Sequence, residues 1–135
     1  MIVDTSALLA YFNAREPDHE AVSGVIEIND ELLVVSPYVL AELDYLIAKR
    51  VGVDAELAVL RELSSGAWEL AVVGVAELEL TTSIIEKYSD QDIGLADASM
   101  VALADRYQTR TIVTLDRRHF DVLRPIGGGR FSIRP

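Results

Sequence analysis

The 135-residue chain contains no cysteine. This absence excludes a disulfide framework, thiol catalysis and a cysteine-bound zinc or iron–sulfur site, and it agrees with a reducing, cytoplasmic location. Proline and glycine are also few, at four and eight residues, which leaves no room for a long disordered linker. The composition therefore predicts a single domain over residues 1–135 that folds without a metal or disulfide staple.

Long apolar runs and a basic leader are missing as well. The opening "MIV" has no basic segment before it, and Asp4 interrupts the apolar run that it begins. We therefore expect no secretory signal peptide. The sequence also offers no apolar stretch of the length that a membrane span requires, so we expect no membrane partner.

Positive charge is scarce and unevenly distributed. The chain has 12 lysines and arginines against 22 aspartates and glutamates, a formal net charge of −10. This balance argues against a protein that coats nucleic acid through bulk electrostatics. Residues 105–135 carry seven arginines and three aspartates, 7 − 3 = +4, so residues 1–104 carry −14. The basic groups are thus concentrated near the C-terminal end of the sequence.

Short apolar runs alternate with longer segments of helical period, a pattern typical of an α/β protein whose parallel sheet has helices on its faces. Ser36-Pro37 is a cap followed by proline in the first helical turn, and Gly52 ends that helix. Strands are expected at 1–4, 31–36, 67–73 and 109–115, with a glycine turn and a short edge strand at 127–133. Helices are expected at 5–13, 18–28, 37–50, 53–63, 76–89 and 95–108.

Four acidic residues fall where such a sheet would bring them together. Asp4 ends the first predicted strand and Asp116 ends a later one. The carboxyl ends of parallel strands line the crevice in which ligands bind. Glu42 and Asp97 lie in the first two turns of helices that would begin at the same edge. We therefore expect the four carboxylates to share one rim.

Each acid also has an ordinary structural explanation. Asp4 can cap a helix, and Asp116 can be a turn residue. Glu42 can belong to a solvated face, although its place beside an apolar stripe favours partial burial. Asp97 is the hardest to explain, because it lies on the core-facing side of a helix that is almost wholly apolar, where an unpaired carboxylate is costly. The positive end of the helix dipole offers it partial compensation.

Taken together, the acids predict a cation site. Clustered carboxylates repel one another, so at neutral pH they share protons or hold a cation. An all-oxygen set suits Mg²⁺, or Mn²⁺, better than zinc. His19 and His119 stand in polar surroundings and are expected to be solvated. Mg²⁺ held by carboxylates serves phosphate chemistry, because it polarises a phosphoryl oxygen and activates water.

Other classes of phosphate-handling protein fit the sequence less well. "GGGR" is no phosphate-binding loop, because it follows no predicted strand and opens no helix. Receiver domains place paired acids after their first strand and a lysine after their last core strand. Haloacid-dehalogenase-type phosphatases require Asp-x-Asp where this chain has Asp4-Thr5-Ser6.

The whole chain resembles the PIN-domain ribonucleases, specifically the VapC-type toxins of toxin–antitoxin pairs. The stretches that carry the resemblance are "MIVDTSALLAYF", "SPYVLAELDYLI", "GLADASMVALADRYQTRTIVTLDRRHF" and "RPIGGGRFSIRP". The resemblance implies a three-layer α/β/α domain that usually forms a homodimer. It also implies a cognate VapB-type antitoxin and Mg²⁺-dependent, endonucleolytic cleavage of RNA.

The resemblance assigns roles to individual residues. It implies that Asp4, Asp97 and Asp116 hold Mg²⁺, and that Glu42 binds the metal or positions the attacking water. The resemblance further implies that the activated water attacks the phosphodiester and that the products carry 5′-phosphate and 3′-hydroxyl ends. The remaining candidates are the supporting hydroxyls and the basic pair expected either to position RNA phosphates or to form a solvated turn: Ser6, Thr114, Arg117 and Arg118.

Two functional classes remain open at this point. The first is the ribonuclease toxin. The second is a PIN-like module that mainly binds a partner, within a DNA-binding complex, and has little nuclease turnover. A Mg²⁺-dependent cleavage assay on structured RNAs separates them.

Overall fold

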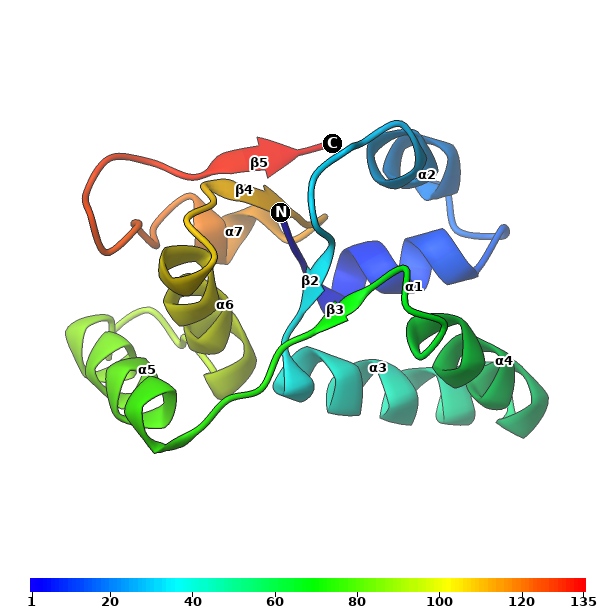
Figure 1. The fold of residues 1–135 in the computed structure, drawn as a ribbon, viewed down its shortest axis with the longest axis horizontal. Coiled ribbons are helices and arrows are strands. Elements are labelled where there is room, and N and C mark those ends of the chain that lie inside the picture. Colours follow the sequence, from blue (N-terminus) through cyan, green and yellow to red (C-terminus); the bar gives the residue numbers. More distant parts are fainter.

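Five parallel strands form the centre of the protein, which we describe from a computed structural model of residues 1–135 (Figure 1). They lie in the spatial order β3-β2-β1-β4-β5, and every pairing is parallel. The predicted α/β class is confirmed, and the strand predicted after the glycines lies at the sheet edge. The strands are β1 (Ile2–Val3), β2 (Val34–Val35), β3 (Glu69–Leu70), β4 (Thr111–Val113) and β5 (Ser132–Arg134).

Helices flank the sheet, with α5 and α6 on one side and α1, α3 and α4 on the other (Figure 1). Six of the seven follow the predicted positions closely. The seventh, α7, was not predicted, because four residues are too few to show a helical period. The helices are α1 (Thr5–Phe12), α2 (His19–Glu27), α3 (Pro37–Arg50), α4 (Val53–Leu63), α5 (Val75–Lys87), α6 (Leu95–Arg106) and α7 (Arg117–Phe120).

The ends of α3 are fixed by its own sequence. Ser36 caps the helix by accepting a hydrogen bond from the backbone N–H of Tyr38, and Pro37 occupies the first turn. After α3 the chain turns at Gly52, whose φ of 122° strongly favours a glycine. The next helix, α4, begins directly after this turn. Local signals therefore place the first turns of α3 without help from the sheet.

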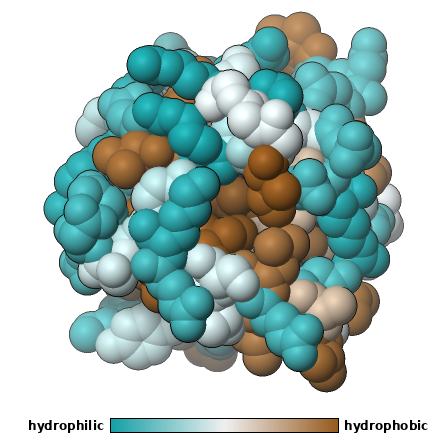
Figure 2. Space-filling view, turned by 90° about the vertical axis from the view of Figure 1, so that its left-hand side faces the viewer, coloured by the Kyte–Doolittle hydropathy of each residue, from teal (hydrophilic) through white to brown (hydrophobic).

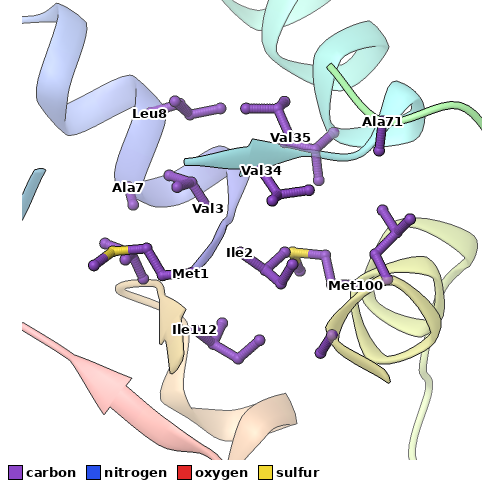
Figure 3. Packing of buried hydrophobic residues seen from close by; sticks show 14 of the residues in the cluster. Met1, Ile2, Val3, Ala7, Leu8, Val34, Val35, Ala71, Met100 and Ile112 are labelled. Carbon is purple, nitrogen blue, oxygen red and sulfur yellow. The ribbon is translucent and has the colours of Figure 1, made fainter. Parts of the chain in front are cut away.

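The sheet is buried on both faces. Ile2, Val34 and Ile112, from three neighbouring strands, are each almost completely inaccessible to solvent. Met100 of α6 lies beside Ile2 on one face, and Leu8 of α1 lies near Val35 on the other (Figure 3). Strands covered on both faces are expected to be continuously apolar. The first polar residue after such a strand therefore marks the point where the chain leaves the core.

The surface is largely polar but not uniformly so. On the side of the molecule where α5 and α6 lie, hydrophobic side chains show between hydrophilic ones in the middle of the face (Figure 2). Separately, Val72 and Val75 at the entry to α5 are 73% and 76% exposed. No helix has both the length and the apolar character that a membrane crossing requires.

Candidate active site

The four acids predicted to converge line a single pocket of about 520 Å³. Asp4 directly follows β1, Glu42 belongs to the second turn of α3, Asp97 to the first turn of α6, and Asp116 precedes α7. Each acid thus comes from a different part of the chain. The fold brings together every carboxylate that the sequence pattern placed at this edge.

Asp4 is buried and held by two hydroxyl groups. Its Oδ2 accepts hydrogen bonds of 2.7 Å from both Ser6 Oγ and Thr114 Oγ1. Although Asp4 occupies the position before α1, its side chain makes no capping hydrogen bond, so the helix-cap explanation does not account for it. The hydroxyls engage one carboxylate oxygen and leave Oδ1 without a hydrogen bond in the chain. A carboxylate oxygen in this setting is suited to binding a cation.

Glu42 is exposed, so the expectation of its partial burial was wrong. Its position beside the apolar stripe of α3 leaves the carboxylate at the pocket, where the hydroxyl of Thr5 donates a 2.8 Å hydrogen bond to Oε2. Thr5 was not among the predicted residues. No local signal identifies it, because the bond joins residues 37 positions apart.

Asp97 is partly buried, with 20% of its side chain exposed. Burial is the main cause that raises its pKa above the ordinary aspartate value, and the negative charges of Asp4 and Asp116 raise it further. His119 and the backbone N–H of Gly94, which lies 3.4 Å from Oδ2, act in the opposite direction. Capping by Asp97 therefore exists but does not offset burial and repulsion.

Asp116 does not end a strand as predicted. Strand β4 stops at Val113, where its pairing with β5 stops, and Asp116 instead lies at the start of α7. Its Oδ1 accepts a 3.2 Å hydrogen bond from the backbone N–H of Arg118. The turn-residue explanation is thus partly correct for Asp116, which nevertheless lines the pocket.

His119 is not solvated, contrary to expectation. Only 13% of its side chain is exposed, and Nδ1 lies 3.1 Å from Asp97 Oδ2 and 3.9 Å from Asp116 Oδ2. His119 Nε2 lies 3.0 Å from Arg118 Nη2. Because a guanidinium can only donate, Nε2 must accept, which places the ring proton on Nδ1, the atom nearer the carboxylates. The spacing of three residues was a sequence signal for the contact with Asp116 only.

The other histidine also departs from expectation. His19 is half-buried, and its Nδ1 lies 2.8 Å from the carbonyl oxygen of Ala10, so it links the start of α2 to α1. It does not line the acidic pocket.

The predicted basic pair lies beside the pocket and not in its lining. Arg117 donates a 2.6 Å hydrogen bond to the carbonyl oxygen of Pro135, and Arg118 is engaged with His119. Both side chains are exposed. Their position is compatible with contact to a bound polyanion and equally with the solvated turn.

The acids fit a divalent cation by their chemistry, although not as a closed cage. No three histidine, aspartate or glutamate side chains lie close enough to hold one ion as they stand. However, the available donors in the pocket are mostly carboxylate oxygens, including the unpaired Oδ1 of Asp4, which is the donor type that Mg²⁺ and Mn²⁺ prefer. A cation would also relieve the repulsion that raises the pKa of Asp97.

Comparison with known proteins gives consistent matches. Residues 1–124 match the model of the PIN domain family. The chain is 70% identical over 135 residues to ribonuclease VapC26 of Mycobacterium tuberculosis (strain ATCC 25618 / H37Rv), and the match covers 100% of both chains.

Two solved structures share the fold. VapC20 of Mycobacterium tuberculosis, described as a sarcin-ricin loop cleaving toxin, has a TM-score of 0.85 at 20% identity, covering 99% of this chain and 98% of its own. DNA-bound VapBC from Salmonella typhimurium has a TM-score of 0.72 at 21% identity, covering 98% and 96%. At these identities the likeness is one of fold.

Proposed function

Because the chain belongs to the PIN-domain family and to its VapC ribonuclease toxins, we propose that it hydrolyses RNA phosphodiesters at the acidic pocket with the help of Mg²⁺. The observation that carries the proposal is the convergence of Asp4, Glu42, Asp97 and Asp116 from separate elements on one pocket. The 70% identical relative, a ribonuclease by name, supports the reaction class.

The proposed metal ligands are Asp4, Asp97 and Asp116, with Glu42 binding the metal or orienting the attacking water. The chemistry that bound Mg²⁺, or Mn²⁺, supplies is polarisation of a phosphoryl oxygen and activation of water. Side chains of the protein prepare the site for this. Thr5 holds Glu42 through its 2.8 Å hydrogen bond, so the carboxylate stays at the pocket although it is exposed.

The acid at the end of β1 is prepared more firmly. Ser6 and Thr114 fix Asp4, and the Ser6 hydroxyl in turn accepts a 3.0 Å hydrogen bond from the backbone N–H of Leu115. This network ties the carboxylate to the chain that follows β4. Ser6 and Thr114 therefore act as supporting residues that set the direction of the free oxygen of Asp4.

A cleavage assay tests the proposal. Transfer RNA and ribosomal RNA fragments are incubated with the purified protein in Mg²⁺ and, separately, in EDTA. We expect endonucleolytic cuts with 5′-phosphate ends in Mg²⁺ and none in EDTA. Cleavage that persists in EDTA contradicts the metal mechanism. Absence of both cleavage and Mg²⁺ binding favours the alternative, a partner-binding module in a DNA-binding complex, which the likeness to DNA-bound VapBC makes worth testing.

We also propose a VapB-type antitoxin as the cognate partner. An acidic pocket that needs a cation can accept a protein cation, so the antitoxin is expected to insert an arginine or lysine among the acids in competition with Mg²⁺. Truncating that basic side chain should restore cleavage by the complex. Full inhibition by an antitoxin with no basic residue near the site would refute this mode of inhibition.

The proposed assembly is a cytoplasmic homodimer. The exposed Val72 and Val75 supply apolar surface of the kind that subunit contacts cover. Light scattering on the parent and on Val75→Glu tests the assembly, and a monomeric parent contradicts it.

A further inference from the structure

The acidic pocket has a second, apolar wall. Its lining includes Leu9 from α1, Tyr38 and Leu46 from α3, and Leu95 from the start of α6. Leu95 is 39% exposed although it stands two residues before the partly buried Asp97. The other three are half-buried. Apolar side chains that line a pocket beside a cluster of carboxylates indicate a ligand with an apolar part as well as a charged one.

Helix α3 places part of this wall directly beside a carboxylate. Tyr38, Glu42 and Leu46 follow one another at intervals of four residues, so they lie along one face of the helix, and all three line the pocket. Each step is about 6 Å along the helix axis. A ligand whose phosphate sits among the acids would therefore have the ring of Tyr38 within reach of the same nucleotide or its neighbour.

Tyr38 differs from every other tyrosine in the chain. Its ring has no aromatic or cationic partner, and its hydroxyl makes no hydrogen bond, whereas its backbone N–H is fixed by Ser36. The other four use their rings or hydroxyls within the protein: Tyr11 packs on Phe12 and Trp68, Tyr45 meets Lys49, Tyr88 meets Lys87, and Tyr107 donates to Glu69. An aromatic ring that is anchored at its backbone and unused within the chain is available to a ligand.

We propose that Tyr38 and Leu95 form a subsite that stacks an unpaired nucleobase of the RNA next to the phosphate held at the acids. This inference rests on the proposed function and narrows it to single-stranded segments, because a base in a duplex is already stacked on its neighbours. Stacking also adds affinity without positive charge, which suits a protein whose net charge is −10. Every base has a flat face, so the subsite demands an unpaired base and does not select among the four.

Binding of a fluorescein-labelled, unstructured 12-nucleotide RNA tests the subsite, with Ca²⁺ in place of Mg²⁺ to slow cleavage. The variants are Tyr38→Ala, Tyr38→Phe and Tyr38→Trp. Tyr45→Ala is the matched control, because it removes a ring of the same size, although a more exposed one, from the same helix outside the pocket. We expect Tyr38→Ala to weaken binding about 5- to 150-fold. Tyr38→Phe and Tyr38→Trp should bind within about twofold of the parent, and so should Tyr45→Ala.

An oligonucleotide with abasic positions separates stacking from a structural effect of the substitution. If the ring stacks on a base, the difference in RNA affinity between the parent and Tyr38→Ala should shrink when the bases are removed. An unchanged difference overturns the proposal, as does equal weakening by Tyr38→Ala and Tyr45→Ala. Normal RNA binding by Tyr38→Ala together with weakened antitoxin binding would assign the ring to the antitoxin and overturn it too. A parent that neither binds Mg²⁺ nor cleaves RNA refutes the proposed function instead.

Discussion

The two ends of the acidic pocket are built differently. At the buried end lies Asp4, a residue that is 8% exposed and whose carboxylate is fixed by the hydroxyls of Ser6 and Thr114. At the exposed end lies Asp116, whose side chain is 47% exposed. The only hydrogen bond of that side chain is the one it accepts from the backbone N–H of Arg118 in the same turn. One acid is therefore held in place before any ligand arrives, whereas the other can adjust.

The difference follows from the sheet. Val3 pairs with Val113 in the parallel ladder, so the next residues, Asp4 and Thr114, leave the sheet side by side. The backbone N–H of Asp4 extends this ladder by donating to Val113 O at 2.9 Å. Asp116 lies beyond this ladder, directly before a helix of four residues, and its backbone N–H donates to Thr114 Oγ1 at 3.0 Å instead. Strand register thus determines the buried end, and a local turn determines the exposed end.

The largest expected effect tests whether the buried end is the more critical one. Asp4→Asn should abolish RNA cleavage, because it removes the charge while keeping the hydroxyl contacts, and Asp116→Asn should leave measurable activity. Single-turnover cleavage rates at saturating Mg²⁺ compare the two. Equal loss in both variants would mean that preorganisation of Asp4 has no bearing on activity.

Replacing Asp97, which lines the same pocket, should abolish function without reducing stability. Asp97→Asn is expected to abolish cleavage, whereas the metal-free variant at pH 7 should be at least as heat-stable as the parent. The raised pKa of Asp97 means that its charged form costs stability at neutral pH, and this cost disappears as pH falls through the elevated pKa. The difference in Tm between variant and parent should therefore narrow between pH 7 and pH 4.

Melting curves in EDTA and in Mg²⁺ check this expectation. Mg²⁺ should stabilise the parent more than Asp97→Asn, since binding to the native state alone adds RT ln(1 + [L]/Kd). If Asp97 served only as a helix cap, the variant would lose about 0.3–1 kcal/mol in EDTA and respond to Mg²⁺ as the parent does.

Removing the hydroxyl of Thr114 should damage the buried end most directly, because only there does it hold a carboxylate; its Oγ1 also accepts a 3.0 Å hydrogen bond from the backbone N–H of Asp116. Thr114→Val keeps the shape but leaves Asp4 Oδ2 with one fewer donor, which should cost about 1–3 kcal/mol of unfolding free energy. Cleavage should fall about 10- to 100-fold, as expected for a residue that orients a proposed metal ligand, here Asp4. Urea denaturation measures the first effect. Thr82→Val, at an exposed position on α5, is the control and should change stability by less than about 0.5 kcal/mol.

Replacing His119 should have a smaller effect, on metal affinity, and that effect should depend on one ring nitrogen, Nδ1. His119→Ala is expected to weaken Mn²⁺ binding about tenfold, because the N–H near Asp97 and Asp116 is removed. His119→Asn restores an N–H at the position of Nδ1 and should recover most of the affinity, whereas His119→Gln should not. Isothermal titration with Mn²⁺ distinguishes them, and identical behaviour of the three variants would show that Nδ1 has no positioning role.

The smallest effect is expected from the exposed arginines. Replacing both Arg117 and Arg118 with alanine should raise the apparent KM a few-fold and flatten its salt dependence. The slope of log KM against log salt concentration should change by about 0.7 for each phosphate of a single-stranded RNA that the arginines no longer neutralise. Kinetics across a salt series measure this. Arg130→Ala, an exposed arginine in the loop before β5, is the control. Unchanged kinetics would leave the pair as a solvated turn.

The sequence alone was sufficient to predict the fold class and the four acids that line one pocket. Hydrophobic period and helix caps act over a few residues, so α3 and α4 begin and end where the sequence indicates. Strands were predicted too long, because apolar runs continue past the last paired residue: β2 covers only Val34–Val35. Asp4 and Asp97 could be identified because each breaks an apolar pattern.

Only the tertiary structure determined how those acids are held. The bond from Thr114 to Asp4 joins residues 110 positions apart and exists because β1 pairs with β4. Neither the contact of His119 with Asp97 nor the bond from Thr5 to Glu42 has a local signal, because both depend on the packing of separate helices. Local rules specify which residues can carry charge or cap a helix, whereas distances between side chains far apart in sequence are fixed only when the sheet register and the helix packing are in place.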